Sequence, residues 1–257
     1  MAKYENGEYT RMAGILKGQF RKRLGHEGVV LTDLDDVWFQ TSVVYLARML
    51  EVGEIYAPLV GKSAEDVRAD LRDAIVVRRE SMHVNPLIMP TSVADLHRRY
   101  GIDDGEVLAR SLEVILSIFD DEIPLHKDAE HALYVLRGVN GVGVAAWTHA
   151  APDWTDRKLA VHPDLLGVFS SGVFPVDVDK PKECISVIES LGKRPDEVMI
   201  IGDSLRSDIW SAVEAGVPRE NVVWVKSDFV EANVGDVPDG IQTASSLWDA
   251  VRQVGGF

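Results

Sequence analysis

Short apolar runs alternate with segments of helical periodicity along the second half of the chain. Each run closes on polar residues, and a short run of β-branched residues closed in this way is typical of a strand buried on both faces. Strands are expected near residues 29–32, 142–147, 172–177, 197–201 and 221–225, and helices near 126–137, 152–160, 182–192, 205–215 and 245–254. This alternation predicts an α/β fold with a doubly wound, mainly parallel, Rossmann-like sheet.

Residues 41–122 follow a different pattern, in which one helix follows another with little strand between them. Ser63 and Asp66 are spaced as a capping box at the start of one of these helices. A break is expected at residues 87–92, because Pro90 interrupts the helical pattern there. The segment is therefore interpreted as an all-helical domain inserted into the α/β core.

The domain organisation follows from this change of pattern. Residues 28–40 and 123–257 form the predicted α/β core, and residues 41–122 form the helical insertion. Residues 1–27 are polar and mixed in charge, and they are interpreted as an N-terminal extension that is a short helix around 12–23 or a loose segment.

Composition narrows the class of protein. The 257 residues carry a formal net charge of −14, which favours solubility and disfavours a broad surface for nucleic acid or for an anionic membrane. No stretch approaches the ~20 apolar residues of a membrane span, and the first residues lack the apolar core of a signal peptide. Cys184 is the single cysteine, so no internal disulfide can form. A cytoplasmic protein is the expectation.

Polar residues follow three of the predicted strands directly. Asp33 and Asp35 come after the first strand, Thr148 after the second and Asp203 after the fourth, while Lys180 precedes a helix. In open α/β sheets the ligand lies beyond the carboxyl ends of the strands, so chemistry is expected at these positions. Carboxylates that are brought together repel one another, and a compensating positive charge is therefore required.

These residues fall in four short motifs. The motifs are DLDDV at 33–37, WTHA at 147–150, KP at 180–181 and GDSLRSD at 202–208. Three of the motifs lie at the ends of predicted strands, and KP precedes a predicted helix. In this order they resemble the four motifs of the haloacid dehalogenase superfamily in its phosphatase branch. The helical insertion resembles that family's helical cap of the first type, and His149 stands where the family usually carries asparagine.

The resemblance implies a phosphomonoester hydrolase with a covalent phospho-aspartate intermediate. Asp33 is the expected nucleophile, and Asp35 the acid that protonates the leaving group and the base that activates water. Thr148 and the amide of His149, expected at a helix start, would bind phosphate oxygens. Lys180 would neutralise charge on the transferring group, although Lys182 lies two residues on and competes for the role.

A metal site is expected among the same carboxylates. Asp33, Asp203 and a phosphate would form three like-charge pairs, each costing about 4 kcal/mol at ~4 Å and an effective dielectric constant of ~20. A divalent cation removes that cost, and a site made only of oxygen ligands favours Mg²⁺. The resemblance adds the backbone carbonyl of Asp35 as a ligand. Asp208 is expected to bind through water or to orient the ligands, unless it only caps the helix or pairs with Arg206.

Other functions use much the same residues. The leading interpretation is hydrolysis of a small soluble phosphorylated metabolite, and a phosphomutase of the same superfamily is the enzymatic alternative. A catalytically silent member used for binding or regulation is the third interpretation, whereas dehalogenation would leave Asp35 and Asp203 without a task. Basic residues of the helical insertion either meet a second anionic group of the substrate or lie on solvated helix faces; they are Arg78, Arg79, His83, Arg98 and Arg99.

Overall fold

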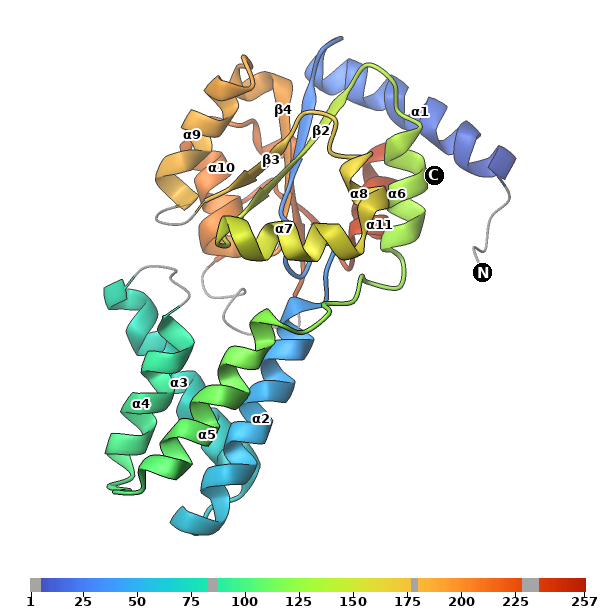
Figure 1. The fold of residues 1–257 in the computed structure, drawn as a ribbon. Helices are drawn as coiled ribbons and strands as arrows, with labels where there is room; N and C mark the ends of the chain where they lie inside the picture. Colours follow the sequence, from blue (N-terminus) through green and yellow to red (C-terminus); the bar gives the residue numbers. More distant parts are fainter. Residues whose placement is uncertain (1–5, 83–86, 177–179, 228–235) are drawn as a thin grey trace. The chain divides into compact units, whose positions relative to one another are not determined.

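The chain forms two compact units in a computed structural model that describes residues 6–82, 87–176, 180–227 and 236–257 (Figure 1). The first unit comprises Met1–Gln40 and Pro124–Phe257, and the second comprises Thr41–Ile123. Within the described ranges, no helix combines the length and the apolar character that crossing a bilayer requires.

The first unit is built on a six-stranded sheet in which all neighbouring strands run parallel. Its strands are β1 (Val29–Thr32), β2 (Gly143–Thr148), β3 (Val173–Pro175), β4 (Val198–Gly202), β5 (Val222–Val225) and β6 (Gln242–Ala244). Their spatial order is β3-β2-β1-β4-β5-β6, so the chain winds outward from β1 first in one direction and then in the other. The predicted doubly wound α/β fold is confirmed, and the point where the winding reverses lies at β1.

Helices cover both faces of this sheet, as Figure 1 shows. The helical elements of this unit are α1 (Asn6–Leu24), α6 (Ala129–Arg137), α7 (Pro152–Val161), α8 (Pro163–Leu166), α9 (Lys180–Ser190), the short 3-10 turns η2 (Pro195–Glu197) and η4 (Arg219–Asn221), the π-helical turn η3 (Leu205–Trp210), α10 (Ser211–Glu214) and α11 (Leu247–Gly255). One core packs Leu31 and Ile200 of the sheet against Ile188 of α9 and Ile209 of η3. Cys184 is buried in the same core, and burial raises the pKa of its thiol to about 12.

The N-terminal segment is part of this unit. The helix expected around residues 12–23 exists, but α1 is longer and is not a loose extension. Its buried side chains recur every three or four residues, the spacing of one helix face; they are Tyr9, Ala13, Leu16, Phe20 and Leu24. This face packs on α6 and α11, and the Tyr9 hydroxyl lies 2.6 Å from Nδ1 of His131. Burial of this apolar stripe holds α1 to the core, although the helix is polar on average.

The second unit is all-helical, with α2 (Thr41–Val60), α3 (Ala64–Met82), α4 (Ile88–Arg99), α5 (Gly105–Leu116) and the short η1 (Ser117–Phe119). Ser63 caps α3 as expected, since its hydroxyl accepts a hydrogen bond from the amide of Asp66 at 3.1 Å. The expected break at residues 87–92 is wrong, because α4 runs through Pro90. Pro90 occupies the first turn of α4, where an N–H has no partner within the helix, so proline disrupts nothing there.

Candidate active site

The turn after β1 sets the position of the first two acids. The amide of Asp33 donates to the carbonyl of Ile201 at 2.9 Å, so Asp33 continues the pairing of β1 with β4. Asp36 then adopts a left-handed conformation with φ of 56° and donates its amide to the carbonyl of Phe39 at 2.8 Å. Aspartate tolerates this conformation better than most residues, so Asp36 has a structural role in the turn. The turn is closed further by Trp38, whose indole N–H donates to the Thr32 hydroxyl at 3.2 Å.

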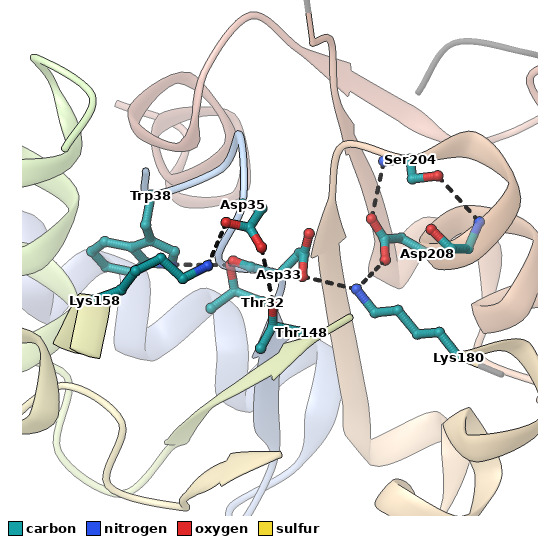
Figure 2. A network of polar contacts seen from close by, with 10 residues as sticks. Thr32, Asp33, Asp35, Trp38, Thr148, Lys158, Lys180, Ser204 and Asp208 are labelled. Carbon is teal, nitrogen blue, oxygen red and sulfur yellow. Dashed lines mark hydrogen bonds and ion pairs between the residues drawn. The ribbon is translucent and has the colours of Figure 1, made fainter. Parts of the chain in front are cut away.

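Lys180 links the residue that follows β1 to a residue of η3. It is the first residue of α9, and its side chain is only 1% exposed. Its Nζ lies 2.8 Å from Oδ1 of Asp33 and 2.5 Å from Oδ1 of Asp208, and Figure 2 shows it between these two carboxylates. Lys182, its competitor in the sequence, is exposed on the same helix.

Three buried carboxylates gather around that lysine. Oxygen atoms of Asp33, Asp203 and Asp208 all lie within 4.8 Å of one another. Asp208 is held by the Ser204 amide, which donates to its Oδ2 at 3.0 Å. Gly202 makes this approach possible, because a Cβ at that position would lie 2.4 Å from Cβ of Asp208. Asp208 therefore pairs with Lys180 and Ser204 and belongs to the acidic cluster.

Burial and mutual repulsion dominate the electrostatics of the cluster. Burial, with the nearby charge of Asp208, raises the pKa of Asp33 to about 7, although Lys180 opposes the rise. Burial and the charges of Asp208 and Asp33 raise the pKa of Asp203 well above its ordinary value. Burial lowers the pKa of Lys180, but Asp208 and Asp33 outweigh it, so the pKa lies above the ordinary value. One ammonium thus faces three carboxylates, and the site favours a further positive charge.

This imbalance predicts how the metal-free protein responds to pH. The pKa of Asp33 is about 7 in the folded state against an ordinary value of 3.8, so between these values the folded protein holds the extra proton. The stability linked to this proton is present below about pH 4 and is lost as the pH rises through about 7. In EDTA, the melting temperature of wild type should therefore fall more steeply between about pH 5 and pH 8 than that of Asp33→Asn. Identical pH dependence in the two proteins would contradict the prediction.

Thr148 and Asp35 meet beside the cluster. Thr148, the last residue of β2, is fully buried, and its hydroxyl lies 3.4 Å from Oδ2 of Asp35. His149 is half-buried in the bend that follows, three residues before α7 begins at Pro152, and not at a helix start as expected. The structure thus places Thr148 and Asp35 together at the carboxyl edge of the sheet.

Lys158 is a site residue that the sequence analysis missed. Its Nζ lies 2.6 Å from Oδ1 of Asp35, and its side chain is 2% exposed (Figure 2). The signal was its position within the polar helix now seen as α7. Lys158 shares the buried stripe of that helix with Trp154, Thr155 and Leu159, where an apolar residue would ordinarily stand.

Two of the basic residues singled out in the helical unit are held by local ion pairs. Arg78 and Arg98 both form ion pairs with Asp95. Arg99 is exposed, whereas His83 and the side chain of Arg79 lie outside the described residues. None of the described arginines in this group is thereby assigned to a substrate.

A parallel sheet with buried acids and a buried lysine at its carboxyl edge is typical of an α/β enzyme core. The chain belongs to the haloacid dehalogenase-like hydrolase family, whose model matches residues 28–216. The resemblance inferred from the four motifs is therefore confirmed.

Individual relatives support the same placement. The chain is 27% identical over 243 residues to the glyceraldehyde 3-phosphate phosphatase of Methanopyrus kandleri. The alignment covers 88% of this chain and 97% of the relative. A haloacid dehalogenase-like hydrolase from Xanthomonas campestris shares the fold with a TM-score of 0.67 and 14% identity, over 89% of this chain and 96% of the other. The magnesium-bound YfnB, a putative hydrolase of Bacillus subtilis, does so with a TM-score of 0.63 and 17% identity, over 90% of this chain and 100% of the other.

Proposed function

We propose that this protein is a phosphomonoester hydrolase that passes through a phospho-aspartate on Asp33 and acts on a small phosphorylated metabolite. The observation that carries the proposal is the buried Asp33, 2.8 Å from Lys180 and clustered with Asp203 and Asp208. The phosphatase name of the Methanopyrus relative supports it.

The proposed reaction has two steps. In the first, an oxygen of Asp33 forms a bond to phosphorus while the ester P–O bond breaks, and Asp35 gives its proton to the leaving alkoxide. In the second, Asp35 takes a proton from water, which attacks phosphorus and releases inorganic phosphate and free Asp33. Lys180 and the Thr148 hydroxyl stabilise the charge of the transferring group, because the phosphoryl transition state is loose and depends on positioning and charge.

The residues present fit a divalent cation. Three buried carboxylates lie within 4.8 Å and carry more negative charge than Lys180 neutralises, and all their donor atoms are oxygen, which suits Mg²⁺. Asp33, Asp203 and the backbone carbonyl of Asp35 would hold the ion, with Asp208 binding directly or through water. When bound, the ion supplies positive charge to the phosphoryl oxygens.

Removal of divalent cations should abolish turnover. We expect EDTA to lower phosphate release from p-nitrophenyl phosphate by at least about hundredfold, and added Mg²⁺ to restore it, because the clustered carboxylates and phosphate otherwise repel one another. Turnover that survives exhaustive chelation would contradict the metal requirement.

The same assay separates the alternative functions. The helical unit is proposed as the cap that selects substrate, and a panel of phosphoglycolate, sugar phosphates, nucleotides and glyceraldehyde 3-phosphate tests its preference. The net charge of −14 disfavours nucleic acid or an anionic membrane as the partner, and the proposed substrates are small metabolites of the cytoplasm. An isomerised sugar phosphate in place of free phosphate would identify a phosphomutase. No phosphate release from any ester by folded protein would identify a catalytically silent member.

A further inference from the structure

Lys158 is an unusually placed cation. It lies in α7, its side chain is 2% exposed, and its Nζ is 2.6 Å from Oδ1 of Asp35. The ammonium also lies 4.1 Å from the centre of the Trp154 ring and 5.6 Å from that of Phe39. One carboxylate and two aromatic faces therefore surround it, and both kinds of group stabilise a cation.

Stability alone does not account for this arrangement. Removing a lysine from water is costly, and a buried ion pair regains little more than that cost. A methionine at position 158 could pack on the same aromatic rings without the desolvation cost. What the ion pair supplies and an apolar residue does not is a fixed direction for the Asp35 carboxylate.

The carboxylate of Asp35 is oriented from two elements. Lys158 on α7 occupies Oδ1, and the Thr148 hydroxyl at the end of β2 faces Oδ2 at 3.4 Å. Figure 2 shows Asp35 between these two partners and beside Asp33. Lys158 therefore holds Oδ1, whereas Oδ2 faces Thr148, the residue that meets phosphate in the proposed reaction.

We infer that Lys158 is a positioning residue, which holds Asp35 so that Oδ2 carries the proton to the leaving alkoxide. The inference rests on the proposed phosphatase function and goes beyond it by assigning a task to α7. Lys158 acts through Asp35 and is not placed against the reacting atoms.

The nature of the leaving group provides a test. An alkoxide is a poor leaving group and needs the proton from Asp35, whereas p-nitrophenolate leaves as an anion. Positioned acid catalysis contributes typically about 10²–10⁴-fold, so loss of the correct direction should affect alkyl phosphates selectively. The measured quantity is kcat/KM, which reports the step in which the leaving group departs.

The experiment compares p-nitrophenyl phosphate with the alkyl phosphate of highest kcat/KM in the panel above, in the Mg²⁺-loaded enzyme. For Lys158→Met we expect kcat/KM to fall at least about tenfold for the alkyl ester and less than about threefold for the aryl ester. Lys158→Arg should lose less alkyl activity than Lys158→Met because it keeps a charged donor, although the larger planar guanidinium does not reproduce the ammonium beside Trp154. Arg157→Met, which removes the neighbouring exposed cation of α7, should leave both values within about twofold.

A double-substitution cycle separates positioning from packing. In an Asp35→Asn background, Lys158→Met should change the alkyl value less than about twofold, because the group that it positions is already gone. Each substrate ratio is measured within one preparation, so a partly unfolded variant lowers both values equally and leaves the ratio unchanged. Equal losses of kcat/KM for both esters, or full additivity in the cycle, would overturn the positioning role of Lys158. Neither result would affect the proposed phosphatase function. A wild type that hydrolyses neither ester would overturn the proposed function and this inference with it.

Discussion

Replacing Asp33 by asparagine should reduce phosphate release by at least about 10⁴-fold, since loss of a nucleophile in covalent catalysis costs this much or more. The side-chain amide of asparagine is too weak a nucleophile to form the covalent bond to phosphorus. The substitution also removes one of the three clustered carboxylates. Acid-quenched wild type incubated with ³²P-labelled substrate should carry covalent phosphate, and Asp33→Asn should carry none. The two measurements together test both the rate and the intermediate.

Asp36→Asn is the matched control for this change. It is the same substitution three residues on, and asparagine tolerates the left-handed conformation that Asp36 adopts. We expect its activity to stay within about threefold of wild type. Asp33→Asn should also fold well. Burial disfavours the charged form of the Asp33 carboxyl and raises its pKa to about 7, and the neutral amide avoids that cost. Turnover above about a tenth of wild type in Asp33→Asn would exclude Asp33 as the nucleophile.

The pattern of the chain predicts the sheet and the residues at its carboxyl edge. Continuous apolar runs identify strands buried on both faces, and the polar residue that ends each run must then lie at the carboxyl edge of the sheet. Asp33, Thr148 and Asp203 follow directly from this rule, and the motif order predicts Lys180 although it lies on a helix. These assignments need only the local sequence pattern and the rule that ligands bind at the carboxyl ends of parallel strands.

Other features depend on tertiary contacts that local pattern does not contain. Helix α1 is polar on average, and its membership of the core rests on an apolar stripe that becomes buried when the helix packs on distant elements, chiefly α6 and α11. Strand β6 (Gln242–Ala244) has no apolar run, because it lies at an edge of the sheet and, among the described strands, pairs only with β5. Lys158 resembles a solvated lysine until Asp35 and Trp154 are placed around it. The one trace of its role in the sequence is that Lys158 recurs at helical spacing with Trp154 and Leu159.

Lys180→Met should damage stability and activity together. The side chain is 1% exposed and separates two buried carboxylates, so its loss leaves Asp33 and Asp208 facing each other without a counter-charge. Removing one partner of a buried ion pair typically costs about 3–5 kcal/mol, which lowers the melting temperature by roughly 6–20 °C in a protein of this size. Activity should fall by about 10²–10³-fold or more, the usual effect of removing a group that stabilises transition-state charge.

Mg²⁺ and pH should separate these two effects. The added cation should restore much of the lost melting temperature of Lys180→Met, because it neutralises the same carboxylates, but it should not restore the rate. Lower pH should also stabilise this variant, because a raised carboxyl pKa makes the folded protein bind protons that the unfolded chain releases. Lys182→Met, an exposed lysine on the same helix, should change the unfolding free energy by no more than about 0.5 kcal/mol. If Mg²⁺ restored full activity to Lys180→Met, the lysine would be no more than a counter-ion of the cluster, and its proposed contact with the transferring phosphoryl group would be wrong.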